Sequence, residues 1–198
     1  MRIENREQLK FVLQKDREKY RQLGYKNWFI GFVMNNDVSK LAWYMRTLRY
    51  EEYWLVKSEA KRISPARLLY LFYRSRRQLW GGRIGVFVPP GTTGYGFQIL
   101  HSGNVIVNER AVIGNDCTCA GMNCIGVDDV FGNNSHFPII GDRCFIGVGA
   151  QIIGKARIAD DCIVAAGAVV NREFEEPNAV LAGIPAAIKK LRTAQDKK

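Results

Sequence analysis

The sequence is poor in histidine and lacks a long apolar run. Its 198 residues contain only two histidines, His101 and His136. The longest apolar stretch, residues 28–34, holds seven residues, whereas a helix needs about twenty to cross a bilayer. Residues 1–15 are charged and have no apolar core of signal-peptide length. We therefore predict no membrane-spanning segment and expect a cytoplasmic protein.

Cysteine is present without the pattern of a disulfide-rich or zinc-binding domain. The five cysteines are odd in number and no signal peptide precedes them, which argues against a disulfide framework. The spacing of Cys117 and Cys119 is not that of a zinc knuckle. We expect four of them, Cys117, Cys119, Cys144 and Cys162, to serve as small buried hydrophobic residues.

The net positive charge of the chain lies entirely in its first half. Residues 1–90 hold 19 Lys and Arg against 8 Asp and Glu, and residues 91–198 hold 10 against 11. Such a surface attracts nucleic acid, anionic lipid or a phosphorylated substrate. No zinc-finger, RNP or KH signature accompanies the charge, so we expect no nucleic-acid partner. Three interpretations remain: contact with an anionic membrane surface, contact with a phosphorylated, lipid-linked acceptor, or a merely solvated helix face.

The first 83 residues have helical periodicity. Apolar positions recur about every 3.6 residues over 9–23, where Gly24 is a plausible stop, and again over 41–48. A third helix begins at Ser64 as N-cap with Pro65 in its first turn, and ends at Gly81-Gly82. Its apolar positions include Leu68, Leu69 and Phe72. We interpret the aromatic residues of these helices, which include Trp28, Trp43, Tyr53 and Trp54, as packing residues and not as a ligand site.

The period then changes to six. The positions spaced by six are Val107, Ile113, Cys119 and Ile125, and then Ile140, Ile146, Ile152, Ile158, Val164 and Val170. Small residues follow most of them four positions later, at Ala111, Cys117, Cys144, Ala150, Ala156, Cys162 and Ala168. This pattern predicts a β-solenoid of short strands and tight corners, with the aliphatic residues pointing inward.

The repeat is interrupted between Ile125 and Ile140, which are fifteen residues apart. The intervening residues 127–138 contain Gly, Asn, Asp and Pro, as loops do, and include His136. A rigid solenoid that extrudes one loop is a common way to place functional groups. His101 lies at the start of the repeat. In strict register it would point inward as a core histidine, but the glycine-rich residues upstream predict an irregular first coil.

Residues 101–189 resemble the left-handed β-helix acyltransferases, most closely the serine acetyltransferase-like group, which includes enzymes of surface-polysaccharide synthesis. The motifs that carry the resemblance are His101-Ser102-Gly103, Ile113-Gly114-Asn115-Asp116, Ile146-Gly147-Val148-Gly149-Ala150, Ala166-Gly167-Ala168 and Ala182-Gly183-Ile184-Pro185-Ala186. The resemblance implies an α+β fold, an N-terminal helical region followed by a left-handed parallel β-helix with an extruded loop. We expect a basic helical domain at 1–83, the β-helix at 84–188 and a tail at 189–198.

The resemblance also implies an activity, transfer of acetyl from acetyl-CoA to a hydroxyl. A free alcohol is a poor nucleophile at neutral pH, and imidazole titrates in the range that suits a general base. By resemblance His101 is that base, His136 lines the acceptor site across a subunit boundary, and Glu109 lies near the acceptor. The pantetheine arm of CoA runs near Val148, Gly149, Ala166 and Gly167. The residues that match positions near its nucleotide end are Asn171, Arg172 and Lys190.

Two departures from the serine-specific members bear on the acceptor. Leu100 stands where those enzymes carry an aspartate that orients the base, and Ser135 stands where they carry an arginine for the serine carboxylate. Because loss of a bidentate carboxylate clamp weakens amino-acid specificity, the sequence favours a sugar of a surface polysaccharide, with L-serine as the alternative.

Two other classes of protein share this solenoid. The gamma carbonic anhydrases hold zinc with three histidines, and this chain has two, so we expect no metal. A catalytically silent scaffold is the remaining alternative. The shared site that the resemblance implies also predicts a homotrimer with three equivalent clefts. A dimer of such trimers, joined through the helical half, is the alternative assembly.

Overall fold

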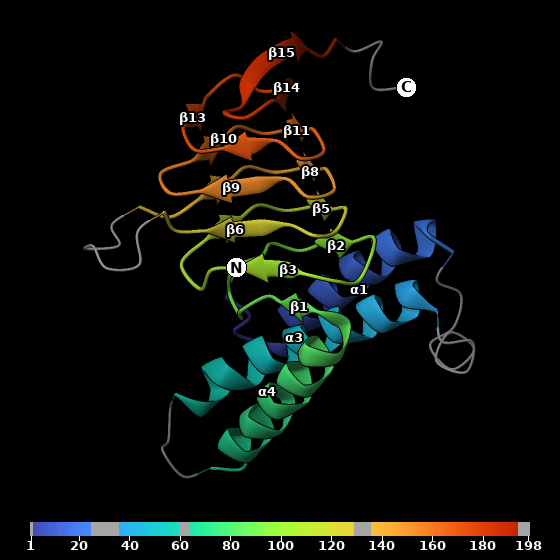
Figure 1. Ribbon diagram of the computed structural model, residues 1–198. Coiled ribbons are helices and arrows are strands. Elements are labelled where there is room, and N and C mark those ends of the chain that lie inside the picture. The colour runs from blue at the N-terminus through green and yellow to red at the C-terminus, as the bar shows by residue number, and fades with distance from the viewer. Residues whose placement is uncertain (1, 25–35, 60–63, 129–135, 194–198) are drawn as a thin grey trace.

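The computed structural model describes residues 2–24, 36–59, 64–128 and 136–193. Three helices come first (Figure 1): α1 (Arg6–Gln22), α3 (Asp37–Ser58) and α4 (Pro65–Ile84). Each is capped by a side-chain oxygen, that of Asn5, Asn36 or Ser64, which accepts a backbone N–H of the first turn. The prediction of a helical N-terminal half is confirmed. No helix in these ranges is both long and apolar enough to span a bilayer.

The third helix ends later than predicted. Gly81 and Gly82 lie within α4, and Gly85 caps the helix in the left-handed conformation with φ 67°. Gly81 is needed for close packing, because a Cβ there would lie 2.5 Å from the carbonyl oxygen of Val86. Gly81 therefore allows the helix to pack closely against the first strand. It does not end the helix.

A parallel β-helix follows, built of three sheets that the chain visits in turn. Sheet A contains β1 (Val86–Phe87), β3 (Val105–Val107), β6 (Cys124–Gly126), β9 (Gln151–Ile153) and β12 (Val169–Val170). Sheet B contains β4 (Val112–Ile113), β7 (Ile139–Ile140), β10 (Arg157–Ile158) and β13 (Glu173–Phe174). Sheet C contains β2 (Gln98–Ile99), β5 (Thr118–Cys119), β8 (Phe145–Ile146), β11 (Ile163–Val164), β14 (Ala179–Ala182) and β15 (Ala187–Leu191).

The period of six is the length of one strand and corner. All ten positions of the repeat are buried, and the small residues predicted at the corners are buried with them. Ile140 pairs with Ile158, one turn of 18 residues later, whereas Ile113 pairs with Ile140, 27 residues later. The interruption therefore inserts nine residues into one turn without moving the strands on either side.

The last strand crosses the expected domain boundary. β15 runs antiparallel to β14, with Val180 opposite Lys190. The boundary expected between residues 188 and 189 falls inside this strand, so the β-helix domain extends at least to Leu191. Lys190 belongs to a strand and not to a tail.

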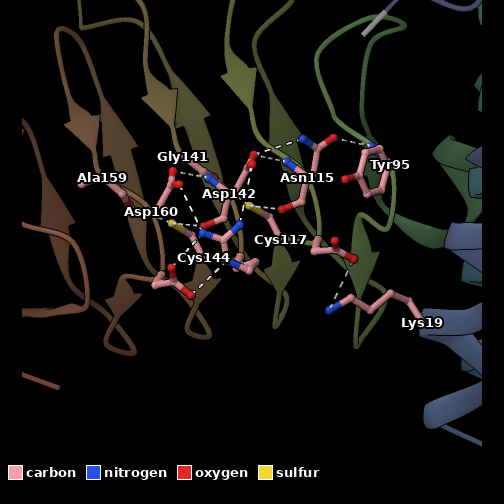
Figure 2. A network of polar contacts seen from close by, with 12 residues as sticks. Lys19, Tyr95, Asn115, Cys117, Gly141, Asp142, Cys144, Ala159 and Asp160 are labelled. Atoms are coloured by element: carbon pink, nitrogen blue, oxygen red, sulfur yellow. Dashed lines mark hydrogen bonds and ion pairs between the residues drawn. The ribbon is translucent and has the colours of Figure 1, made fainter. Parts of the chain in front are cut away.

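The corner between sheets B and C is held by a ladder of side chains (Figure 2). Asn115 Oδ1 accepts the N–H of Tyr95, Asp142 Oδ1 accepts the N–H of Asn115 at 2.7 Å, and Asp160 Oδ1 accepts the N–H of Asp142 at 2.8 Å. Each side chain thus satisfies a backbone donor of the preceding coil. Such pairing is needed because a tight corner leaves peptide groups without strand partners.

The predicted structural role of the cysteines agrees with their burial. Cys117, Cys119, Cys144 and Cys162 are fully buried and unpaired. The Sγ atoms of Cys117 and Cys144 donate to carbonyl oxygens of the next coil, those of Gly141 and Ala159 (Figure 2). Burial raises the pKa of the Cys119 thiol to about 12, which keeps it protonated and unreactive.

The helical half closes the open end of the β-helix. Arg49 is fully buried, pairs with Asp16 at 2.8 Å and Glu52 at 3.1 Å, and donates to the carbonyl oxygens of Thr93 and Gly94. Asp16 and Glu52 in turn accept backbone N–H groups of the same first coil. These contacts satisfy polar groups that have no preceding coil to pair with.

Candidate functional site

The β-helix has three corners, and the predicted site residues lie on two of them. The corner from sheet C to sheet A contains residues 100–104, 120–123, 147–150 and 165–168 in successive coils. The turn 183–186 between β14 and β15 lies above them, since Gly183 accepts the N–H of Val169. The corner from sheet A to sheet B contains residues 108–111, the described residues 127–128 and 136–138 between β6 and β7, and the residues after β9 and β12. We call them the C–A corner and the A–B corner.

His101 lies at the C–A corner of the first coil and is exposed. The inward position of this coil is Ile99, which is fully buried and pairs with Cys119, 20 residues later. The first turn is therefore two residues longer than the regular 18, and the extra residues widen the corner that holds the histidine. The interpretation of His101 as a core residue is wrong, because the register that it assumes does not hold here.

The corner above His101 is built of small residues. Backbone N–H groups link its coils: Met122 donates to Gly103, Gly149 to Gly121 and Gly167 to Val148, at 2.9–3.1 Å. Gly121 has φ +125°, and a Cβ there would lie 3.3 Å from the Cβ of His101. A larger residue at 121 would therefore crowd the imidazole.

Four of the residues predicted to line the CoA channel lie on this same corner. Val148 and Gly149 lie two coils above His101, and Ala166 and Gly167 lie three coils above it. Since neighbouring coils are about 4.8 Å apart, the column extends on the order of 14 Å from the histidine. The side chains of Met122 and Val148 are exposed along it, which gives the column an apolar character.

Two polar residues that support this corner were not predicted. Asp37, at the start of α3, accepts the N–H of Ser102 at 2.9 Å and its Oγ–H at 2.6 Å. Asn123 is fully buried, accepts the N–H of Gly121 and donates to the carbonyl oxygens of Gly147 and Ala150. Asn123 had a signal in the sequence, because it occupies a position four after Cys119 where the repeat otherwise has a small apolar residue.

Glu109 and His136 lie on the A–B corner, away from His101. Both are exposed. They are close in the fold, since Pro138 accepts the N–H of Val112 and the Arg110 guanidinium lies 5.4 Å from the ring centre of Phe137. The three-residue strands of sheet A separate this corner from the C–A corner by about 10 Å. Within one chain, the structure does not bring the two histidines together.

The remaining predicted residues are divided between two elements. Asn171 and Arg172 follow β12 on the A–B corner and are exposed. The Arg172 guanidinium donates to the carbonyl oxygen of Ala186 at 3.3 Å, so this side chain reaches the turn between β14 and β15 above the C–A corner. Lys190 lies on β15 and is exposed. Ser135 lies outside the described residues, whereas Leu100 is half-buried next to His101 in the chain. In the described ranges, no three His, Cys, Asp or Glu side chains converge as a metal site would require.

Comparison with known proteins agrees with this architecture. Residues 137–172 match the bacterial transferase hexapeptide family (six repeats). The serine acetyltransferase of Mycobacterium tuberculosis is 34% identical over 105 residues, which are 52% of this chain and 45% of that protein. The soybean serine acetyltransferase superposes with a TM-score of 0.68 at 26% identity, over 91% of this chain and 69% of the other. That of Brucella abortus gives 0.71 at 21% identity, over 95% and 70%.

The chain has the serine acetyltransferase fold. The predicted left-handed parallel β-helix with an N-terminal helical region is confirmed, as is the resemblance to acyltransferases of this type. The chain spans about half the length of the curated relative from Mycobacterium tuberculosis. Within the serine acetyltransferase fold, His101 stands in the first coil, where the β-helix meets the helices.

Proposed function

We propose that the protein transfers acetyl from acetyl-CoA to the hydroxyl of L-serine. The observation that supports this most directly is the C–A corner, an exposed imidazole at the foot of a column of small residues. Among the solved relatives with this fold, the soybean enzyme was crystallised with serine and the Brucella abortus enzyme with coenzyme A.

In the proposed reaction His101 acts as general base. The acceptor oxygen attacks the thioester carbonyl carbon while its proton moves to the imidazole. The tetrahedral intermediate then collapses, the C–S bond breaks, and the imidazolium returns the proton to the departing thiolate. The products are an O-acetyl ester and free CoA. Proton transfer of this kind contributes about 10²–10⁴-fold to the rate.

The donor lies along the C–A corner in this proposal. An extended pantetheine arm needs a narrow apolar channel, and side chains at Gly121, Gly149 or Gly167 would obstruct it. The column leads from His101 toward Arg172, whose positive charge suits the phosphates at the far end of the donor. Acetyl-CoA is a substrate here and not a resident cofactor.

The acceptor site is completed by a neighbouring subunit in the proposed homotrimer. His136 and Glu109 lie together on the A–B corner, about 10 Å from the C–A corner. A threefold axis beside the β-helix brings the A–B corner of one copy to the C–A corner of the next. This arrangement supplies a second histidine to each base.

The relatives favour serine over the saccharide hydroxyl that the sequence favours. The saccharide remains a second candidate because Leu100 and Ser135 replace the aspartate and arginine expected of a serine-specific site. A neutral sugar has no carboxylate for an arginine to bind, whereas serine binding without that arginine requires another cation.

Acceptor profiling separates the two. Release of CoA from acetyl-CoA is followed with L-serine, with D-serine and with nucleotide sugars at equal concentrations. The proposal predicts stereospecific turnover with L-serine. Turnover confined to sugars would contradict serine as the acceptor and retain O-acetyl transfer, and failure of the protein to bind acetyl-CoA would contradict the proposed function altogether.

A further inference from the structure

The helix α4 carries an apolar stripe on its exposed side. Leu68, Leu71, Phe72 and Leu79 recur at helical spacing, and their side chains are 71%, 43%, 53% and 67% exposed. The predicted helical pattern through Leu68 and Phe72 is therefore correct, but it does not mark a core face. The buried side of α4 is formed by other residues, among them Tyr70 and Ile84.

This stripe lies at the end of the molecule opposite the last coils. Figure 1 shows α4 beneath β1, with α3 alongside it and the β-helix extending away from them. α4 packs mainly against α3 and β1. The exposed stripe therefore lies at the end of the β-helix that the helical half closes.

Arginines border the stripe on both sides. Arg67 and Arg74 are seven residues apart on one side, and Arg76 and Arg83 are seven apart on the other. Of the five arginines of α4, only Arg77 pairs with a carboxylate among the described residues, that of Glu51. The helix contains no acidic residue.

Aromatic rings hold these arginines at the edge of the stripe. The Arg76 guanidinium lies 3.8 Å from the ring centre of Trp43, and that of Arg83 lies 5.6 Å from the ring centre of Trp80. Trp43 and Trp80 contact each other edge to face at 5.1 Å. Tryptophan and arginine beside an exposed apolar stripe are typical of helices that lie in a membrane interface.

We propose that α4 binds the surface of an anionic lipid bilayer, with the stripe in the acyl boundary and the arginines at the headgroups. The charge pattern favours lipid over a second copy of the chain. A twofold contact through the stripe would oppose the arginine rows of the two copies, and like charges across an interface disfavour association. An anionic surface instead places negative headgroups beside the arginines on both sides of the stripe.

The test is co-sedimentation of the full-length protein with vesicles. Neutral phosphatidylcholine vesicles are compared with vesicles that contain equal parts of phosphatidylcholine and phosphatidylglycerol, each at low and high salt. The proposal predicts binding to the anionic vesicles that weakens with salt. Absence of binding to either kind of vesicle would overturn it.

A charge variant of α4 and a matched control on α1 test which surface binds the vesicles. R67Q/R74Q/R83Q should weaken binding about 100-fold, since each arginine near an anionic surface contributes about fivefold. R6Q/K10Q/R17Q removes the same charge from exposed positions of α1 and should weaken binding far less. Equal losses in the two variants would show that net charge alone attracts lipid, which would overturn the assignment to α4.

The apolar contribution is tested with L68Q/F72Q/L79Q. This variant should keep its fold, because the three side chains are exposed, and should lose vesicle binding. Light scattering of the same variant tests whether a second copy of the chain, and not lipid, covers the stripe. If the substitutions reduce the oligomer size of the wild-type protein in solution, the stripe is an interface between copies and the lipid proposal is wrong.

Discussion

The position of His101 depends on a side chain from another element. Asp37 of α3 accepts two hydrogen bonds from Ser102, the residue after the histidine. Hydrogen bonds to a carboxylate are about twice as strong as those between neutral groups. The helical half therefore fixes the corner that carries the proposed base, although it contributes no residue to the proposed reaction.

Asp37→Ala should lower turnover about 10- to 100-fold and leave the KM for acetyl-CoA nearly unchanged. The reason is that small displacements of a catalytic group have large effects on rate, whereas the donor column begins one coil higher. Ser102→Ala is the matched variant. Ser102→Ala removes only the hydrogen bond from Oγ–H, whereas Asp37→Ala also removes the one from the backbone N–H, so Ser102→Ala should be the milder variant. The double variant should be no slower than Asp37→Ala, because that substitution already removes both hydrogen bonds; additive losses would show that Asp37 acts by another route.

At the same scale, the buried thiols predict how stability depends on pH. Burial raises the pKa of Cys119 to about 12 from an ordinary value of 9.0. A raised pKa means that the stabilisation is complete below about pH 9 and is lost as the pH rises toward 12, because the unfolded thiol ionises first.

The free energy of unfolding should therefore fall between pH 9 and 10.5, with Cys119 responsible for about 1–2 kcal/mol of the fall. Cys119→Val is the suitable variant, since Val164 and Val170 occupy the same position of the repeat. Urea unfolding at both pH values should show a smaller fall for Cys119→Val than for the wild type. An identical fall would assign the pH dependence to other groups.

At the scale of elements, the β-helix was largely predictable and the helices only in part. The period of six is visible in the sequence because every coil places the same kind of residue in the same buried environment. Ten positions of the chain therefore give the same evidence for the β-helix. The interruption of the repeat was equally visible. A helix gives less information, because an apolar stripe such as that of Leu68 and Phe72 has the same spacing whether it faces a core or the outside.

The candidate site was predicted less completely than the fold. The histidines and the small residues of the C–A corner could be found by resemblance. The support from Asp37 could not, because it depends on how a helix 65 residues earlier packs against the first coil. The exposure of His101 depends on two extra residues in the first turn. The glycine-rich residues upstream indicated that this coil is irregular, but they did not give the number of extra residues.

The ladder at the corner between sheets B and C predicts a local effect on stability. Asp142 Oδ1 accepts hydrogen bonds from both the N–H and the Nδ2 of Asn115, at 2.7 and 3.2 Å. Asp142→Ala should lower the free energy of unfolding by about 2 kcal/mol, because it leaves these donors without their partner. Asp142→Asn keeps an oxygen in place and should cost less than about 1 kcal/mol. Equal losses in urea unfolding would contradict the importance of the ladder.

At the scale of the whole molecule, the fold separates the two histidines and the proposed trimer reunites them. Sheet A stands between the C–A corner with His101 and the A–B corner with His136. A closed threefold assembly is the simplest arrangement in which every copy gives one histidine and receives the other. The proposed contact with lipid would form at the end of the molecule that the helical half closes.

Subunit mixing tests this arrangement. His101→Ala and His136→Ala should each be poorly active alone. Co-expressed in equal amounts, they should regain about a quarter of wild-type activity, because one site in four then receives both histidines if subunits assort at random. Sites contained within single chains would regain no activity, and a monomer in light scattering would contradict the trimer directly.

The central claim is that His101 is the base for acetyl transfer. The most direct measurement is turnover and acetyl-CoA affinity of one purified variant, His101→Ala. We predict a turnover lower by about 10²–10⁴-fold, an unchanged melting temperature and nearly unchanged affinity for acetyl-CoA, because the side chain is exposed and lies below the donor column. A stable variant that retained near-normal turnover would contradict the mechanism.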